Sequence, residues 1–192
     1  MSSKPTKPAP PKTKDRPSDD FYPTPEYVTR ALLKREHFNG TIWEPACGAG
    51  DMSEVLESHG YDVRSTDLND HGYGAAGVDF LTQTAIDPRI GAIVTNPPFI
   101  CAEQFIARAL VLNPGKVALF LRLSFIEGKR RYRQIFRDHA PARIWAFSGR
   151  VTLLPKGNPG GRPKNGFMAF AWYVWDDRRF NRSTELGWIG DE

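Results

Sequence analysis

The sequence of 192 residues contains only two cysteines, Cys47 and Cys101, and four histidines. The cysteines lack C-x-x-C spacing and the histidines show no metal-ligand spacing, so we expect neither a disulfide framework nor a metal site. No apolar run approaches the roughly 20 residues of a membrane-spanning helix. The Lys- and Pro-rich N-terminus has no apolar stretch typical of a secretory signal. These absences favour a cytoplasmic protein with no membrane partner.

The rest of the composition suits one folded domain. Apolar residues make up 40% of the chain and aromatic residues 12%, enough for a hydrophobic core. Residues 1–18 instead alternate lysine and arginine with proline, so we expect a disordered basic tail before a single domain of residues 19–192. The formal net charge of +4 and the pI of about 9.1 permit a polyanionic partner without requiring one.

Short apolar runs alternate with helical patterns through most of this domain. We expect strands at residues 41–43, 61–66, 77–79, 90–95, 116–123, 143–147 and 167–175. Helices are expected to follow Thr24 and Asp51, which can act as N-caps, and to cover residues 102–112 and 130–138. The alternation predicts an α/β fold with a doubly wound, mostly parallel sheet of these seven strands. Ligands of such sheets bind where the strands end, so the residues that follow each strand are the candidate site.

A glycine-containing turn follows the first expected strand and consists of Glu44, Pro45, Ala46, Cys47, Gly48, Ala49 and Gly50. The turn has neither the third glycine of a dinucleotide-binding loop nor the lysine of a phosphate-binding loop. The carboxylate of Glu44, at the start of this segment, favours a cationic ligand. S-adenosylmethionine, with its sulfonium and amino groups, is such a ligand.

Two further pairs of residues end expected strands. Asp67 and Leu68 follow the second strand, where a carboxylate can accept hydrogen bonds from both hydroxyls of a ribose. Asp79 and Phe80 end the third strand, where we expect the carboxylate to accept from an adenine amino group and the ring to stack on the base. Together with the glycine turn, these positions predict an S-adenosylmethionine site.

The most specific motif follows the strand at 90–95 and consists of Asn96, Pro97, Pro98 and Phe99. An exocyclic amino group such as adenine N6 is a poor nucleophile, because its lone pair is delocalised into the ring. The Asn96 side-chain oxygen and the Pro97 carbonyl can hold both N–H groups and localise the lone pair, while the prolines keep these acceptors rigid. Phe99 is expected to stack on the target base. The motif predicts methyl transfer to an amino group without a strong general base.

With these motifs in this order, the chain resembles the amino-group methyltransferases that carry an Asn-Pro-Pro-Tyr/Phe motif, chiefly the DNA adenine-N6 methyltransferases. Residues 20–25 are similar to their N-terminal cofactor motif, which implies cofactor contacts from Tyr22, Pro23 and Thr24, with Thr24 at the methionine carboxylate. The resemblance spans roughly residues 20–175. It implies the class I S-adenosylmethionine-dependent, Rossmann-like fold with a final antiparallel strand, here 167–175.

The same resemblance implies S-adenosylmethionine as cofactor and nucleic acid as partner, with DNA favoured over RNA. No target-recognition domain is visible, as expected of a phage-type enzyme in the cytoplasm of a bacterium or an infected host. An RNA adenine-N6 methyltransferase, a protein glutamine N5 methyltransferase and a catalytically silent nucleic-acid-binding module stay open as alternatives. The sequence indicates neither the target sequence nor the oligomeric state.

Basic residues outside the motifs are candidate contacts to nucleic acid. They are Lys129, Arg130 and Arg131 at the start of an expected helix, and Lys156, Arg162 and Lys164 in a long loop rich in glycine and proline. Such residues contact phosphates rather than read bases, which predicts relaxed sequence specificity. Cys101 lies just past the catalytic motif and is expected to pack rather than to act as a nucleophile.

Overall fold

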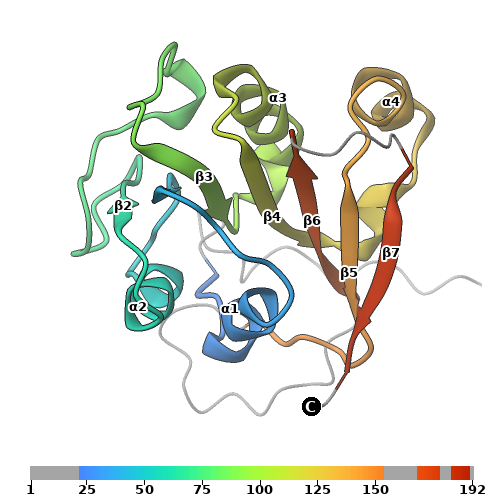
Figure 1. Ribbon diagram of the computed structural model, residues 1–192, viewed down its shortest axis with the longest axis horizontal. Helices are drawn as coiled ribbons and strands as arrows, with labels where there is room; N and C mark the ends of the chain where they lie inside the picture. Colours follow the sequence, from blue (N-terminus) through green and yellow to red (C-terminus); the bar gives the residue numbers. More distant parts are fainter. Residues whose placement is uncertain (1–21, 154–167, 178–182, 191–192) are drawn as a thin grey trace, which may run out of the picture.

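The computed structural model describes residues 22–153, 168–177 and 183–190. The expected tail of residues 1–18 and the loop cations Lys156, Arg162 and Lys164 lie outside these ranges. The described residues form one sheet with helices on both faces (Figure 1), which is the doubly wound α/β architecture that the sequence predicts. No helix in the described ranges is long and apolar enough to cross a lipid bilayer.

Seven strands form the sheet in the order β2-β1-β3-β4-β6-β5-β7. Their bounds are β1 Thr41–Glu44, β2 Val63–Ser65, β3 Ile90–Thr95, β4 Lys116–Arg122, β5 Arg143–Phe147, β6 Phe170–Asp176 and β7 Glu185–Ile189. β6 is antiparallel to both of its neighbours, and the other pairings are parallel. The carboxyl ends of β1 to β4 therefore meet at one edge of the sheet, where a ligand site is expected.

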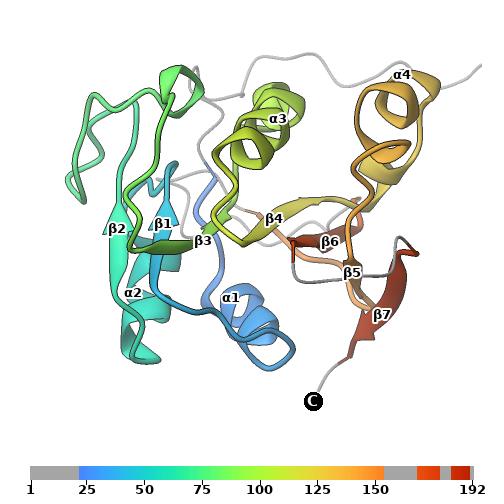
Figure 2. The ribbon, with the colours of Figure 1, turned by 45° about the horizontal axis from the view of Figure 1, so that its top comes forward.

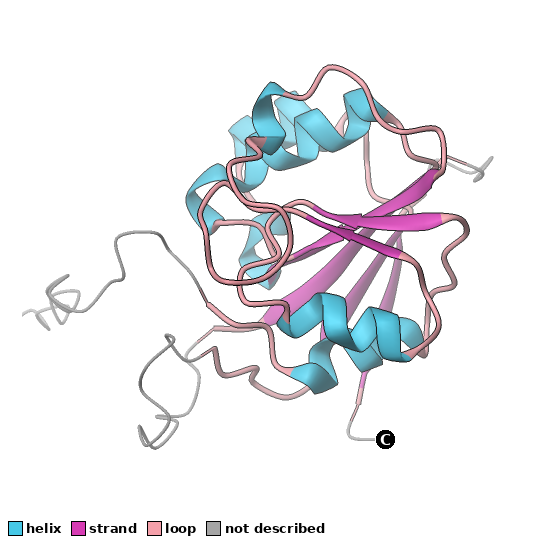
Figure 3. Cartoon of the chain, turned by 90° about the vertical axis from the view of Figure 1, so that its left-hand side faces the viewer, coloured by secondary structure: helices cyan, strands magenta, loops and turns pink. Residues whose placement is uncertain are grey.

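The helices lie in two layers. Their bounds are α1 Glu26–Leu33, α2 Asp51–Ser58, α3 Ala102–Leu112 and the short α4 Lys129–Arg131, which a π-helical turn at Tyr132–Phe136 continues. Single 3₁₀ turns occupy Phe80–Thr82, Phe99–Cys101 and Leu123–Ile126. α1 and α2 lie on one face of the sheet, and α3 and α4 lie on the other (Figure 2). The described part of the chain therefore has three layers, with the sheet in the middle (Figure 3).

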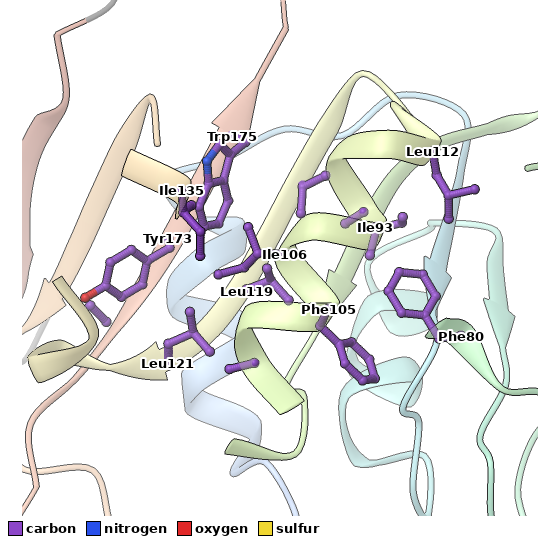
Figure 4. Close-up of a cluster of buried hydrophobic side chains, with 14 of the residues drawn as sticks. Phe80, Ile93, Phe105, Ile106, Leu112, Leu119, Leu121, Ile135, Tyr173 and Trp175 are labelled. Atoms are coloured by element: carbon purple, nitrogen blue, oxygen red, sulfur yellow. The ribbon is translucent and has the colours of Figure 1, made fainter. Parts of the chain in front are cut away.

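Side chains of the central strands alternate between two hydrophobic clusters, one on each face of the sheet. In β6, Tyr173 and Trp175 belong to the cluster under α3, whereas Trp172 and Val174 belong to the cluster under α1 and α2. Figure 4 shows the first cluster, with Phe105 of α3 among its members. Burial on both faces explains why β4 and β6 read as nearly continuous apolar runs in the sequence.

The elements agree with the sequence predictions with two exceptions: one predicted strand does not form, and one strand of the sheet was not predicted. β3, α3 and β5 have the predicted bounds, and most others differ by a few residues at an end. The predicted strand at 77–79 is wrong. The isolated bridge nearby joins Thr66 to Ala75, before that range, and glycines with positive φ interrupt the extended backbone around it. The unpredicted β7 supplies the seventh strand, so the antiparallel β6 is not the last strand.

The predicted helix caps are also wrong by one position. Pro25 and Gly50 occupy the N-cap positions of α1 and α2, and neither end has a side-chain cap hydrogen bond. Thr24 is instead buried, and its hydroxyl accepts a hydrogen bond from the Asn96 side chain. Asp51 becomes the first helical residue, where its charge is favourable beside the positive end of the helix.

A buried ion network closes the edge of the sheet opposite the strand ends that carry the motifs. The Glu36 carboxylate accepts hydrogen bonds from Lys116 Nζ at 2.9 Å and Arg143 Nη2 at 3.0 Å, and Asp176 accepts from Arg143 at 2.7 Å. Trp145 Nε1 donates a further bond at 2.9 Å. Burial opposes ionisation of Glu36, but hydrogen bonds from Arg143, Trp145 and Lys116 outweigh it and hold its pKa below the usual value. The network ties the α1–β1 connection to β4, β5 and β6.

We predict that Glu36→Ala lowers the free energy of unfolding by about 3 kcal/mol, because two largely buried cations lose one of their two carboxylate partners and keep only Asp176. Since the pKa of Glu36 is lowered from 4.5, the contribution is present above that pH and is lost as the pH falls through the folded-state value. Urea unfolding at neutral and acidic pH measures both effects. Asp87→Ala, which breaks an exposed pair with Arg89, is the control and should change stability little. Equal losses in the two variants would contradict the role of the network.

Candidate functional site

A pocket of about 660 Å³ opens at the carboxyl ends of β1 to β4. Its volume lies within the range of small-molecule sites. The residues expected at the cofactor and the reacting group come together around it, namely Tyr22, Pro23, Thr24, Glu44, Pro45, Ala46, Cys47, Asp67, Leu68, Asp79, Phe80, Asn96, Pro97, Pro98 and Phe99. No group of three or more His, Cys, Asp or Glu side chains in the described ranges is arranged to hold a metal ion.

Gly48 and Gly50 shape the turn but do not line the pocket. Both have positive φ, 55° and 95°, which glycine adopts without strain. A Cβ at Gly50 would lie 2.6 Å from the ring of Tyr73, so this glycine makes room for a protein side chain rather than for a ligand. The glycines therefore set the path of the chain from β1 into α2.

Glu44 is almost fully buried at the base of the pocket, where its carboxyl group accepts a short hydrogen bond from the Ser53 hydroxyl. Burial raises its pKa to about 8, and the nearby charges of Asp51 and Asp67 act in the same direction. Burial therefore favours the protonated form of the carboxyl group, and a cation placed beside it would favour ionisation. Burial likewise raises the pKa of the nearby Cys47 thiol to about 12. The reactive thiolate is therefore disfavoured, and the side chain serves in packing.

Asp67 joins two loops at the rim. Its two carboxylate oxygens accept backbone hydrogen bonds from Gly48 and Asn69, each at 2.9 Å. His71 Nε2 lies 3.9 Å from the same carboxylate. Each oxygen can accept more than one hydrogen bond, so the group can brace the turn and still meet a ligand hydroxyl. Leu68, beside it, is 60% exposed at the edge of the pocket.

Asp79 and Phe80 reach the pocket from a 3₁₀ turn rather than from the end of a strand. The Asp79 side chain caps this turn by accepting from the Leu81 amide at 2.9 Å. The Phe80 ring packs on Trp43 and Phe105 with centroid distances of 5.2 and 4.8 Å, and only 2% of the residue is exposed. Little of the Phe80 ring is therefore accessible for the expected stacking on a base, because the ring already forms part of the core.

The Asn96 side chain is fixed in one orientation. Its amide nitrogen donates to Thr24 Oγ1 at 3.0 Å and to the Tyr22 carbonyl at 3.3 Å. Because a carbonyl can only accept, these bonds identify the nitrogen and leave the amide oxygen as an acceptor. That oxygen is buried and has no hydrogen-bond partner among the described residues. A buried acceptor without a partner costs about 1–3 kcal/mol, which a ligand donor would recover.

Phe99 lies between several groups of the pocket wall. Tyr22 stacks on it with centroids 6.3 Å apart, Phe170 lies at 5.9 Å, and the Arg122 guanidinium lies 4.8 Å from the ring centroid. A base that stacks on the part of the ring beneath Arg122 would have to displace this long and flexible side chain.

The predicted basic contacts have different surroundings. Arg130 is largely exposed and donates to Glu103 at 2.8 Å. Arg131 bonds Glu103 and three backbone carbonyls of residues 124–127, so it holds the loop before α4. Lys129 is exposed at the start of α4 and does not line the pocket.

Several pocket residues were not among the predicted site residues, and Arg122 is the charged one at a strand end. It is the last residue of β4, so the rule that ligands bind where parallel strands end was sufficient to find it. A charged residue directly after five buried apolar positions was the signal.

Neither a family model nor a curated protein matches this sequence. Solved structures do match. A proposed class I S-adenosylmethionine-dependent methyltransferase from Listeria monocytogenes has 14% identity and a TM-score of 0.58 over 85% of this chain and 63% of its own. A proposed RNA methyltransferase from Pyrococcus horikoshii has 13% identity and a TM-score of 0.58 over 86% and 91% of the two chains. A dimethyladenosine transferase from Plasmodium falciparum has 13% identity and a TM-score of 0.54 over 81% and 62%.

This is the fold of the class I methyltransferases. The expectation of a Rossmann-like methyltransferase sheet is thereby confirmed. The chain spans less than two thirds of the Listeria and Plasmodium proteins, 63% and 62% of their lengths.

The buried Glu44 predicts an unusual dependence of stability on pH. Its pKa is raised from 4.5 to about 8, so between these values the folded protein keeps a proton that the unfolded chain releases. This contribution to stability is greatest below pH 4.5 and is lost as the pH rises to about 8. Glu44→Gln cannot titrate, so its stability relative to the unaltered protein should rise by up to about 4 kcal/mol between pH 5 and 8. Urea unfolding measures the difference, with the exposed Glu54→Gln as control. Parallel pH curves for the unaltered protein and Glu44→Gln would disprove the assignment.

Proposed function

We propose that this chain is an S-adenosylmethionine-dependent methyltransferase that modifies the exocyclic N6 amino group of adenine in nucleic acid, with DNA preferred. The observation that carries the proposal is the Asn96 amide, whose nitrogen is held by Tyr22 and Thr24 and whose buried oxygen has no partner among the described residues. The methyltransferase fold and the pocket at the strand ends support the same activity.

The residues around the pocket fit the cofactor. S-adenosylmethionine would supply an activated methyl group: a nitrogen–carbon bond would replace its sulfur–carbon bond, the sulfur would leave as a neutral thioether, and the amine proton would pass to water. Glu44 would face its positive charge, Asp67 would accept from the ribose hydroxyls, and Asp79 would accept from the adenine amino group. Thr24 accepts from Asn96, and its own hydroxyl hydrogen can be donated to the methionine carboxylate.

The catalytic loop would act on the target amino group through hydrogen bonds alone. The Asn96 side-chain oxygen and the Pro97 carbonyl would accept from the two N–H groups, which localises the nitrogen lone pair. Pro97 and Pro98 restrict the backbone, so these acceptors need little reorganisation during the reaction. The Phe99 ring would stack on the target base once the Arg122 side chain moves off the ring.

Transfer of labelled methyl from S-adenosylmethionine to duplex DNA, single-stranded DNA, RNA and protein tests this proposal directly. We expect N6-methyldeoxyadenosine in hydrolysates of the DNA, with single strands modified well because they avoid the few kcal/mol needed to extract a base. The Pyrococcus neighbour, described as a proposed RNA methyltransferase, makes RNA the second substrate to compare. A label found only in protein, or no cofactor binding in calorimetry, would refute the proposal.

We predict that Asn96→Ala lowers the rate of methyl transfer by about 100-fold or more, because one preorganised acceptor is lost. Cofactor affinity and thermal stability should stay close to those of the unaltered protein. Asn39→Ala, an exposed asparagine before β1, is the matched control and should leave the rate unchanged.

Thr24→Val should also slow transfer, by about 10-fold, because the Asn96 amide loses the hydroxyl that fixes its orientation. Thr24→Ser keeps a hydroxyl and should restore most of the rate. Full activity in Asn96→Ala, or equal rates in the valine and serine variants, would show that the amide does not hold the amino group.

A further inference from the structure

A second pocket of about 220 Å³ adjoins the main one. The two share Phe99, Ile100 and Arg122 as a common wall. On its far side the second pocket is lined by Glu103 of α3 and by Arg130 and Arg131 of α4. It therefore lies directly beside the position proposed for the target base.

Arg122 differs from the other arginines of this pocket. Arg130 and Arg131 both donate to the Glu103 carboxylate, at 2.8 and 3.3 Å. Arg122 has its guanidinium over the Phe99 ring at 4.8 Å, and its buried Nε has no hydrogen-bond partner among the described residues. A buried guanidinium donor without an acceptor is costly, so the site is suited to an anionic acceptor.

The charges of the second pocket favour an anion. Three arginines and one carboxylate, Glu103, are its charged lining residues in the described ranges, which leaves a net positive charge. The planar guanidinium presents paired N–H donors that match two oxygens of a phosphate. A base edge offers no full negative charge, so phosphate fits this chemistry better than a second base.

We propose that the second pocket binds a backbone phosphate of the substrate strand next to the target adenine, with Arg122 as its main ligand. The inference rests on the proposed function, because a base held at Asn96 would lie in the main pocket, which shares the wall of Phe99 and Arg122 with the second pocket. Movement of Arg122 from the Phe99 ring to the phosphate would also uncover the ring for the base. Phosphate binding and base stacking are thereby coupled through one side chain.

Fluorescence anisotropy with a labelled thymidine oligonucleotide that contains one deoxyadenosine tests the proposal. In matched oligonucleotides, an uncharged methylphosphonate replaces the phosphate on the 5′ or the 3′ side of the adenosine. We expect one of these replacements to weaken binding by the unaltered protein about 10-fold. Arg122→Gln should weaken binding of the unmodified oligonucleotide by a similar factor and should be insensitive to the same replacement. Its slope of log K against log salt should fall by about 0.7.

Two variants make the result specific. Arg122→Lys keeps the charge but loses the paired donors, so its affinity should lie between those of the unaltered protein and Arg122→Gln. Arg89→Gln removes the same charge from an exposed side chain before β3, at the opposite edge of the sheet, and should behave as the unaltered protein does. Cofactor binding measured by calorimetry checks that each variant is folded.

The outcomes separate this inference from the proposed function. If Arg122→Gln keeps the methylphosphonate effect, or binds no more weakly than Arg89→Gln, the phosphate site is overturned whether or not the protein methylates DNA. If the unaltered protein transfers no methyl group but the phosphate effect depends on Arg122, the site stands and the proposed reaction fails.

Discussion

Two hydrogen bonds from the Asn96 amide nitrogen join the end of β3 to the segment that precedes α1. The bonded residues are 74 and 72 positions apart in the sequence, so local conformational preference cannot provide the contact. It depends on α1 being packed on the sheet, where Val28 and Leu32 are fully buried and the Trp172 indole donates to the Val28 carbonyl at 3.0 Å. The direction of the amide oxygen is therefore a result of tertiary packing, and the four-residue motif alone does not determine it.

The parts of the fold that the sequence predicts best are those whose burial is two-sided and whose ends carry strong turn residues. β3 is buried along most of its length and ends at Asn96 and two prolines, which cannot continue the ladder. α3 has a buried stripe at helical spacing and ends at Asn113, which adopts a left-handed conformation with φ 47°. In both cases the local signal and the tertiary environment agree, so the bounds could be predicted to the residue.

The errors occur where one of these signals is missing. Residues 72–79 have apolar members but also Gly72, Gly74 and Gly77 with positive φ, and a loop with a single bridge results. β7 carries exposed Leu186 and Trp188 and a glycine at its centre. The local sequence therefore gives little indication that this segment pairs with β5. The predicted count of seven strands agrees with the sheet, although one predicted strand is absent from it and one strand of the sheet was not predicted. Phe80 shows the same limit, since only packing reveals that its ring faces Trp43.

Buried polar groups have partners at one edge of the sheet, whereas two such groups at the other edge have none among the described residues. At the amino ends of β4 and β5, Lys116 and Arg143 are paired with Glu36 and Asp176, so each of these charged groups has a partner. At the carboxyl ends of β3 and β4, the Asn96 oxygen and the Arg122 Nε are buried without partners among the described residues. Each such group costs about 1–3 kcal/mol, a loss that burial of the hydrophobic core must offset. A donor to Asn96 and an acceptor for Arg122 would satisfy both groups, and a nucleotide carries both, in its amino group and its phosphate. The two groups without partners at this edge are therefore complementary to one class of ligand.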